Sequence, residues 1–131
     1  MGTTQYAHLQ EDYNQLLFAN AAAITSDTNS STLDFSMAGG APDFDVFIKQ
    51  TGTGTGETCT YLLYQSSDNF VSDTADVLPL RLSGVNADGE YIIHLSNQLI
   101  TKRYFRLRAD VTITTGGTSM NILAYAKAKR P

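Results

Sequence analysis

Apolar and polar residues alternate along most of the chain beyond residue 31, with the period of two that is typical of β-strands. Stretches of this kind, together with one strand-like run that is apolar on both faces, predict seven strands beyond residue 31, and the beginning of the chain brings the count to about eight. The seven strands cover residues 32–35, 44–49, 58–65, 77–82, 90–95, 103–114 and 120–127. The runs between them are rich in Gly, Ser, Asn and Asp, which favour turns.

The beginning of the chain is less regular. Residues 3–14 are polar and fit an arm or a loose first strand, whereas residues 15–25 are apolar and fit either a strand or a helix. Residues 26–31 are Ser, Asp, Thr and Asn, a composition that predicts a turn. We therefore divide the chain into an N-terminal arm or first strand, residues 1–25, and a folded β-domain, residues 26–131.

The predicted strands follow one another at intervals of roughly 10 to 15 residues, and no convincing helix follows residue 25. Short strands separated by Gly and Ser turns are typical of an antiparallel all-β sandwich or barrel rather than of a parallel α/β sheet. A chain of 131 residues suits one domain of this kind. We expect helix in less than about a tenth of the residues, well below the usual third.

Charged residues make up only 17% of the chain, and they are unevenly distributed. Residues 1–101 contain twelve acidic and two basic side chains, whereas residues 102–131 contain seven basic and one acidic. This distribution favours an oriented contact surface for a protein, and the net charge of −4 repels duplex DNA, so we expect no nucleic-acid partner. The chain has no apolar run of membrane-spanning length and no signal-peptide pattern, so we expect no membrane partner and synthesis in a cytoplasm.

Side chains that commonly carry chemistry are few. Cys59 is the only cysteine, which excludes an intrachain disulfide, and its position in a strand predicts a small buried side chain. Glu90 and His94 lie about 13 Å apart on one strand, too far to share a metal ion. No Gly-x-Ser-x-Gly elbow is present, although two of the acids could still meet as a carboxylate pair. We expect no enzyme activity, no metal and no cofactor.

The Gly-rich stretch at residues 52–56 has the composition of a phosphate loop but not its context. A phosphate loop requires a helix directly after its glycines, so that the helix N-terminus faces the phosphates. Here strand-like segments lie on both sides, and no Gly-Lys-Ser or Gly-Lys-Thr follows. We interpret the stretch as a hairpin turn whose glycines adopt positive φ angles.

The strand around residues 103–111 has the most informative pattern in the chain. Its apolar side chains point one way, and a basic and aromatic stripe, Tyr104, Arg106, Arg108 and Asp110, points the other way. One interpretation is a solvated face whose arginines pair with neighbouring acids. The other is a surface that docks on an acidic protein, since Arg and Tyr are enriched at interface hot spots. The candidate interface residues are Tyr104, Arg106, Arg108, Lys127 and Lys129.

Two segments resemble parts of a known family. One is the strand and polar turn Tyr-Leu-Leu-Tyr-Gln-Ser-Ser-Asp-Asn-Phe at residues 61–70, and the other is Arg-Tyr-Phe-Arg-Leu-Arg at residues 103–108. A Gly-Gly turn at 116–117 and a last apolar strand follow them. From about residue 32 onward the series resembles the phage capsid cement (decoration) proteins of the type found on Bordetella phage, which have a jelly-roll fold.

The resemblance implies a jelly-roll sandwich of about eight strands and a structural role in the virion. Such a protein binds the outer surface of an icosahedral phage head and bridges subunits of the major capsid protein. We also expect it to form a homodimer or homotrimer, whose copies residues 6–18 would hold together. An alternative is a carbohydrate-binding β-sandwich of a phage receptor-binding appendage, with Tyr and Phe as stacking platforms. The side chains expected inside the sandwich are Leu63, Phe105, Leu107, Val111 and Ile122.

Overall fold

The computed structural model describes residues 4–6, 15–35, 43–72, 76–112 and 120–128. Within these ranges there is no α-helix, and the one helical turn is the short 3₁₀ segment η2 (Asn97–Leu99). The strands are β1 (Thr4–Tyr6), β2 (Gln15–Ile24), β3 (Thr28–Asn29), β4 (Thr32–Asp34), β5 (Phe44–Thr51), β6 (Thr58–Ser66), β7 (Asp76–Val85), β8 (Gly89–Leu95), β9 (Tyr104–Thr112) and β10 (Met120–Ala128). The predicted all-β class is confirmed.

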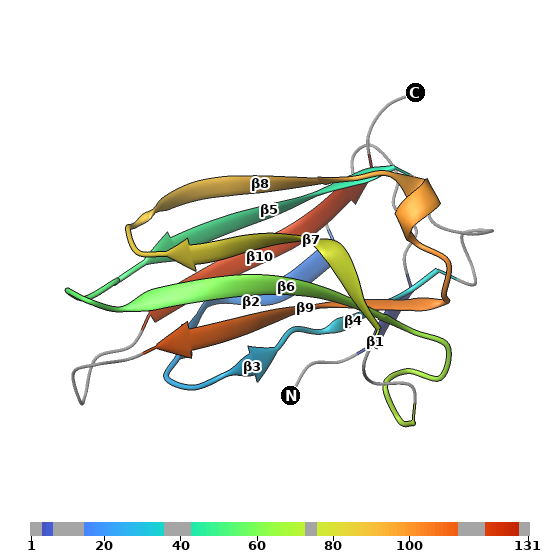
Figure 1. Cartoon of the computed structure of the whole chain (residues 1–131), viewed down its shortest axis with the longest axis horizontal. Helices are drawn as coiled ribbons and strands as arrows, with labels where there is room; N and C mark the ends of the chain where they lie inside the picture. Colours follow the sequence, from blue (N-terminus) through green and yellow to red (C-terminus); the bar gives the residue numbers. More distant parts are fainter. Residues whose placement is uncertain (1–3, 7–14, 36–42, 73–75, 113–119, 129–131) are drawn as a thin grey trace.

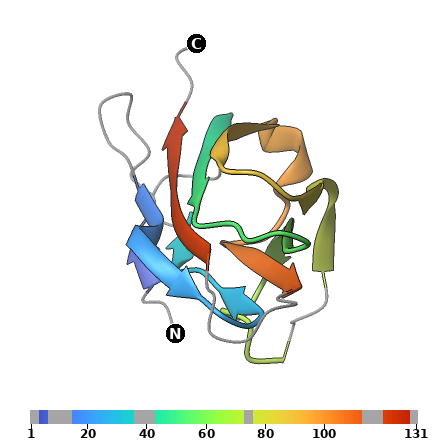
Figure 2. The same cartoon turned by 90° about the vertical axis from the view of Figure 1, so that its left-hand side faces the viewer.

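The strands form two sheets that pack face to face (Figures 1 and 2). Sheet A has the order β1-β4-β9-β6-β7, with β3 also paired to β9, and sheet B has the order β2-β10-β5-β8. All described pairs are antiparallel except β1 with β4. Apart from short β1 and β3, the pairing is nested: β2 with β10, β4 with β9, β5 with β8, and β6 with β7. This nested order, with the chain changing sheets at every connection except β6 to β7, is a jelly roll.

The structure settles one open question near the N-terminus and corrects one prediction there. The apolar run that fitted either a strand or a helix forms β2, which pairs with β10 at the edge of sheet B. The predicted turn at residues 26–31 is partly wrong, because β3 lies within it and pairs with β9. Ser30 explains the pairing: its N–H donates to the carbonyl of Leu107 at 2.8 Å, and its hydroxyl accepts the Leu107 N–H at 2.8 Å.

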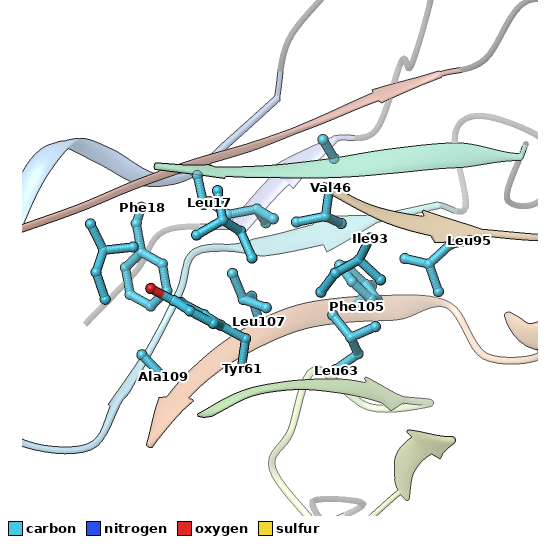
Figure 3. Packing of buried hydrophobic residues seen from close by; sticks show 14 of the residues in the cluster. Leu17, Phe18, Val46, Tyr61, Leu63, Ile93, Leu95, Phe105, Leu107 and Ala109 are labelled. Atoms are coloured by element: carbon cyan, nitrogen blue, oxygen red, sulfur yellow. The ribbon is translucent and has the colours of Figure 1, made fainter. Parts of the chain in front are cut away.

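The core lies between the two sheets, where side chains from both inner faces meet (Figure 3). Leu63, Phe105, Leu107 and Ile122 are fully buried, as predicted, while Val111 is only partly buried at the margin of the core. Cys59 is also fully buried on the inner face of β6. Three phenylalanines form a ring cluster whose centroids are 5.3 to 6.4 Å apart, Phe35, Phe44 and Phe105. Such tilted and edge-on contacts add to the stabilisation from apolar burial.

A polar link crosses the core between the sheets. The hydroxyl of Tyr61 on β6 donates to Oε1 of Gln50 on β5 at 2.6 Å, and both side chains are fully buried. Burial raises the pKa of Tyr61, so its hydroxyl stays protonated and remains the donor. The amide nitrogen of Gln50 donates to the Thr53 hydroxyl at 2.8 Å and to the Val85 carbonyl at 3.3 Å. Gln50 therefore joins sheet B to sheet A and to the loop after β5.

We expect Tyr61→Phe to lower the free energy of unfolding by roughly 1–3 kcal/mol, because it leaves a buried amide oxygen without a donor while keeping the ring. The measurement is the midpoint and slope of urea unfolding. Tyr64→Phe is the matched control, since Tyr64 lies on the outer face of the same strand, and its change should stay within about 0.5 kcal/mol. Equal losses in the two variants would contradict a specific role for the inter-sheet bond.

Candidate protein-interaction site

The candidate interface residues of β9 lie together on the outer face of sheet A. Because Phe105, Leu107 and Ala109 are buried in the core, the alternation of the strand turns Tyr104, Arg106 and Arg108 outward. The strand register places these three opposite outward-facing residues of β6, namely Ser66, Tyr64 and Leu62. Arg81 on β7 lies beyond Leu62 in the next position of the same row. The stripe predicted from the sequence is therefore a continuous part of a sheet face.

Arg106 is held under an aromatic ring. Its guanidinium carbon lies 3.9 Å from the centroid of the Phe70 ring, within the range of a cation–π contact. Nε of Arg106 is buried and has no hydrogen-bond acceptor among the described residues. Desolvation, with a smaller contribution from the charge of Arg108, lowers the pKa of Arg106 below its usual value. Arg106 therefore carries a partly desolvated charge that no acidic side chain of the described residues pairs with.

The loop between β6 and β7 fixes Phe70 over Arg106. The hydroxyl of Ser66 accepts the backbone N–H of Phe70 at 2.8 Å, and the carboxylate of Asp68 accepts those of Val71 at 3.2 Å and Ser72 at 3.0 Å. Asn69 and Phe70 have positive φ angles of 59° and 63°, a conformation that is strained for side chains other than Gly. The local hydrogen bonds compensate for this strain and hold the ring in place.

Arg108 differs from Arg106 because acids of its own chain neutralise it. Its Nε lies 2.5 Å from Oδ1 of Asp110, and its Nη2 lies 3.4 Å from Oδ2 of Asp27. The hydrogen bond to Asp110 raises the pKa of Arg108. Asp27 also accepts the backbone N–H of Val111 at 2.9 Å, which ties the β2–β3 turn to β9. For Arg108, the structure therefore agrees with the first interpretation, in which the arginine pairs with neighbouring acids.

The sequence pattern missed a bidentate ion pair next to the stripe. Nε and Nη2 of Arg103 donate to the two oxygens of Asp34 at 2.8 and 2.9 Å, and the side chain of Asp34 is only 3% exposed. Arg103 precedes β9, and Asp34 ends β4, so the pair fastens these neighbouring strands. The basic run before β9 gave a signal for Arg103, but no sequence signal identified its partner 69 residues away.

Of the two remaining candidate residues, Lys127 does not extend the stripe. Lys127 lies on β10, where it faces outward from sheet B opposite Asp45. Sheet B is the other layer of the sandwich, so Lys127 and Arg106 belong to opposite faces of the molecule. Lys129 lies outside the described residues.

The Gly-rich stretch at 52–56 binds carboxylates of its own chain. It connects β5 in sheet B to β6 in sheet A, so it is not the hairpin turn that we predicted, although Gly52 and Gly56 have the expected positive φ angles of 72° and 79°. Thr53 N–H donates to Asp88 at 2.9 Å, and Gly54 N–H donates to the buried Glu57 at 2.7 Å. Hydrogen bonds from Thr53, and a weaker one from the Gly52 N–H, lower the pKa of Asp88. The amides of Gly52, Thr53 and Gly54 are therefore occupied by carboxylates of the same chain and not open to a phosphate.

Chemistry elsewhere is sparse in the described part of the chain. His94 is an exposed histidine, and its Nδ1 lies 2.6 Å from Oδ1 of Asp45 across β8 and β5. The described residues contain no group of three metal-ligating side chains. Among the same residues, no helix has the length and apolar character needed to cross a bilayer.

Comparisons with protein-family models, with curated proteins and with solved structures found no match for the chain. The jelly-roll assignment therefore rests on the strand pairing itself. This fold supports many unrelated functions, so a function for the chain has to be argued from its surfaces.

We expect the thiol of Cys59 to be inert in the folded protein, because burial raises its pKa to about 11. Ellman's reagent at pH 8 should label the native protein slowly and incompletely. The same protein unfolded in urea is the control and should release one equivalent of thiol, since Cys59 is the only cysteine. Rapid stoichiometric labelling of the folded protein would contradict the buried position.

Proposed function

We propose that the protein is a structural component of a phage virion, a capsid cement (decoration) protein that binds the outer face of the icosahedral head. In this role it bridges neighbouring subunits of the major capsid protein through the outer face of sheet A. It binds the assembled lattice in preference to separate subunits, and this preference stabilises the lattice by mass action. No cofactor, metal, nucleic acid or membrane takes part.

The observation that carries the proposal is the state of Arg106. Its guanidinium is ordered by Phe70 before any partner arrives, so little side-chain entropy remains to be lost on binding. Its charge is partly desolvated, and none of the ion pairs among the described residues includes Arg106. A carboxylate on a partner that reaches the guanidinium would supply the missing compensation, with the geometry that Arg favours.

The distribution of charge supports an acidic partner surface. Seven basic residues lie in the described part of the chain, and five of them belong to β7, to β9 or to the two positions before β9. They are Arg81, Lys102, Arg103, Arg106 and Arg108. The rest of the chain is strongly acidic, so long-range repulsion would turn this side of the molecule toward an acidic shell.

The carbohydrate-binding alternative has weaker support. A sugar-binding platform needs an aromatic ring with a face open to the ligand. The exposed sheet faces do present a pair of rings, Phe47 and Tyr125, but these stack on each other with centroids 5.0 Å apart and an interplanar angle of 20°. The stacking uses one face of each ring, and we therefore do not adopt this function.

We expect Arg106→Ala to weaken binding to the shell by at least roughly tenfold, because truncating a buried charged contact typically costs 2–5 kcal/mol. Arg108→Ala should weaken it less, since Asp110 and Asp27 already neutralise Arg108 within the chain. The measurement is titration of each variant onto shells assembled from the major capsid protein of the same genome, without bound cement protein.

Gln98→Ala is the control, because Gln98 is exposed in η2, away from both sheet faces. Arg106→Lys separates charge from geometry: it retains the positive charge but cannot form a bidentate contact, so it should restore only part of the affinity. Thermal melts confirm that each variant folds. Wild-type affinity of Arg106→Ala at low and moderate salt would exclude the outer face of sheet A as the docking surface.

A further inference from the structure

The outer face of sheet B carries an ordered arrangement of side chains that the proposed function does not use. The register of β10, β5 and β8 aligns their outward residues in three rows across the strands. We call these the upper, central and lower rows of sheet B. The upper row is Leu123, Lys49 and Glu90; the central row is Tyr125, Phe47 and Ile92; and the lower row is Lys127, Asp45 and His94.

The central row is apolar across the whole sheet. Leu16 on β2 pairs with Tyr125 and extends the row to all four strands. Leu16 is 43% exposed and Ile92 is 48% exposed, while Phe47 and Tyr125 stack between them. A groove with a volume of about 340 Å³ follows this row, lined by residues that include Phe47, Ile92 and Tyr125. Large apolar side chains in a contiguous exposed row mark an interaction surface more often than scattered ones do.

The charges that flank the central row have an alternating order. On β5, Lys49 lies above the row and Asp45 below it, and on β8, Glu90 lies above the row and His94 below it. Residues four apart on a strand are about 13 Å from each other, so the two flanking rows lie at similar distances from the central row. On β5, opposite charges thus lie on the two sides of the apolar row, and on β8 a carboxylate and an imidazole do so.

We propose that the outer face of sheet B binds a second copy of this chain, with a two-fold axis that runs along the central row. A rotation about this axis exchanges the upper and lower rows while each strand stays over its own counterpart. Lys49 then faces Asp45 of the second copy, and Glu90 faces His94 of the second copy. The central rows of the two copies meet and bury their apolar side chains, as an isologous interface requires.

The charges also favour this axis over a two-fold axis that runs along β5. An axis along β5 would place Lys49 over Lys49 and Asp45 over Asp45 of the second copy. Like charges placed opposite each other across an interface oppose association. The arrangement of charges is therefore self-complementary about the axis along the central row and self-repelling about an axis along β5.

The size of the face indicates a weak dimer. Four strands of about eight residues give a face of roughly 500 Å² per copy, or about 1,000 Å² in total, near the lower limit of specific interfaces. An interface of this size with one apolar row is expected to dissociate in the range of about 1–100 μM. Association should therefore depend on concentration in the isolated protein.

The proposal is tested by sedimentation velocity of the isolated protein over a range of concentrations. Wild-type protein should form a dimer, and Ile92→Lys and Lys49→Glu should each weaken it by at least roughly tenfold. The charge-exchanged double variant Asp45→Lys/Lys49→Glu should recover most of the lost association, because it restores opposite charges across the proposed axis. No shell is present, so failure of this test would leave the shell-binding proposal intact, and the reverse also holds.

Two matched controls lie on sheet A. Val77 on β7 is 42% exposed and pairs with Tyr64 of the outer face, so Val77→Lys makes the same kind of change as Ile92→Lys on the other layer. Arg81→Glu likewise matches Lys49→Glu. Neither control should change the association, and thermal melts should show that all variants fold.

A zero-length carbodiimide cross-link gives the contact directly. In an equimolar mixture of ¹⁴N-labelled and ¹⁵N-labelled protein, peptides that contain Lys49 and Asp45 should be joined between the two labels, which distinguishes links between copies from links within one.

A wild-type protein that stays monomeric at about 1 mM would overturn the proposal. A dimer that survives Ile92→Lys would overturn the choice of face. Loss of the dimer in Ile92→Lys without recovery in the double variant would overturn the axis. A monomeric protein whose tyrosine fluorescence responds to an added oligosaccharide would assign the groove to a glycan instead.

Discussion

The apolar core between the two sheets determines which side chains reach the surface. On β9 the inner residues Phe105, Leu107 and Ala109 are fully buried, and on β5 the inner residues Phe44, Val46 and Ile48 are also buried. A shift of either strand by one residue would place arginines or aspartates in this core. The register of both strands is therefore strongly fixed, and so is the composition of both outer faces. The candidate interfaces are the outer sides of strands whose inner sides build the core.

Polar groups enter the structure mainly where the chain must leave a sheet. Gln50 joins β5 to β6 and to the loop after β5. Gln65 on β6 likewise binds the segment just before β9. The side chain of Gln65 accepts the backbone N–H groups of Thr101 at 2.9 Å and Lys102 at 3.1 Å. Buried amides of this kind satisfy backbone groups that no longer have strand partners. They fix the connections without supplying any chemistry.

The sequence was sufficient for properties that depend on alternation and insufficient for those that depend on distant contacts. It predicted the strands β4 to β10 and the inward direction of Leu63, Phe105 and Leu107, because the period of two is local. It did not predict β3, whose pairing requires Ser30 to meet β9 from the other end of the chain. Nor did it place Phe70 over Arg106, since this contact depends on positive φ angles at two residues that are not glycine. The sequence predicted the stripe on β9, but it did not show that Phe70 covers Arg106 whereas Asp27 and Asp110 pair with Arg108.

The two proposed surfaces constrain each other because they lie on opposite layers of the sandwich. If two copies join through sheet B, their two A sheets point away from each other. The dimer then contains four sheets about 10 Å apart, which separates the two A-sheet backbones by about 30 Å. Such a dimer carries one Arg106 on each of two opposite sides, so it cannot place both on a single flat surface. It can instead join two acidic surfaces that face each other across a gap of this width. If both proposals hold, the dimer would bridge neighbouring subunits only where their acidic surfaces face each other across this gap, which follows from the sheet B interface and the position of Arg106 together.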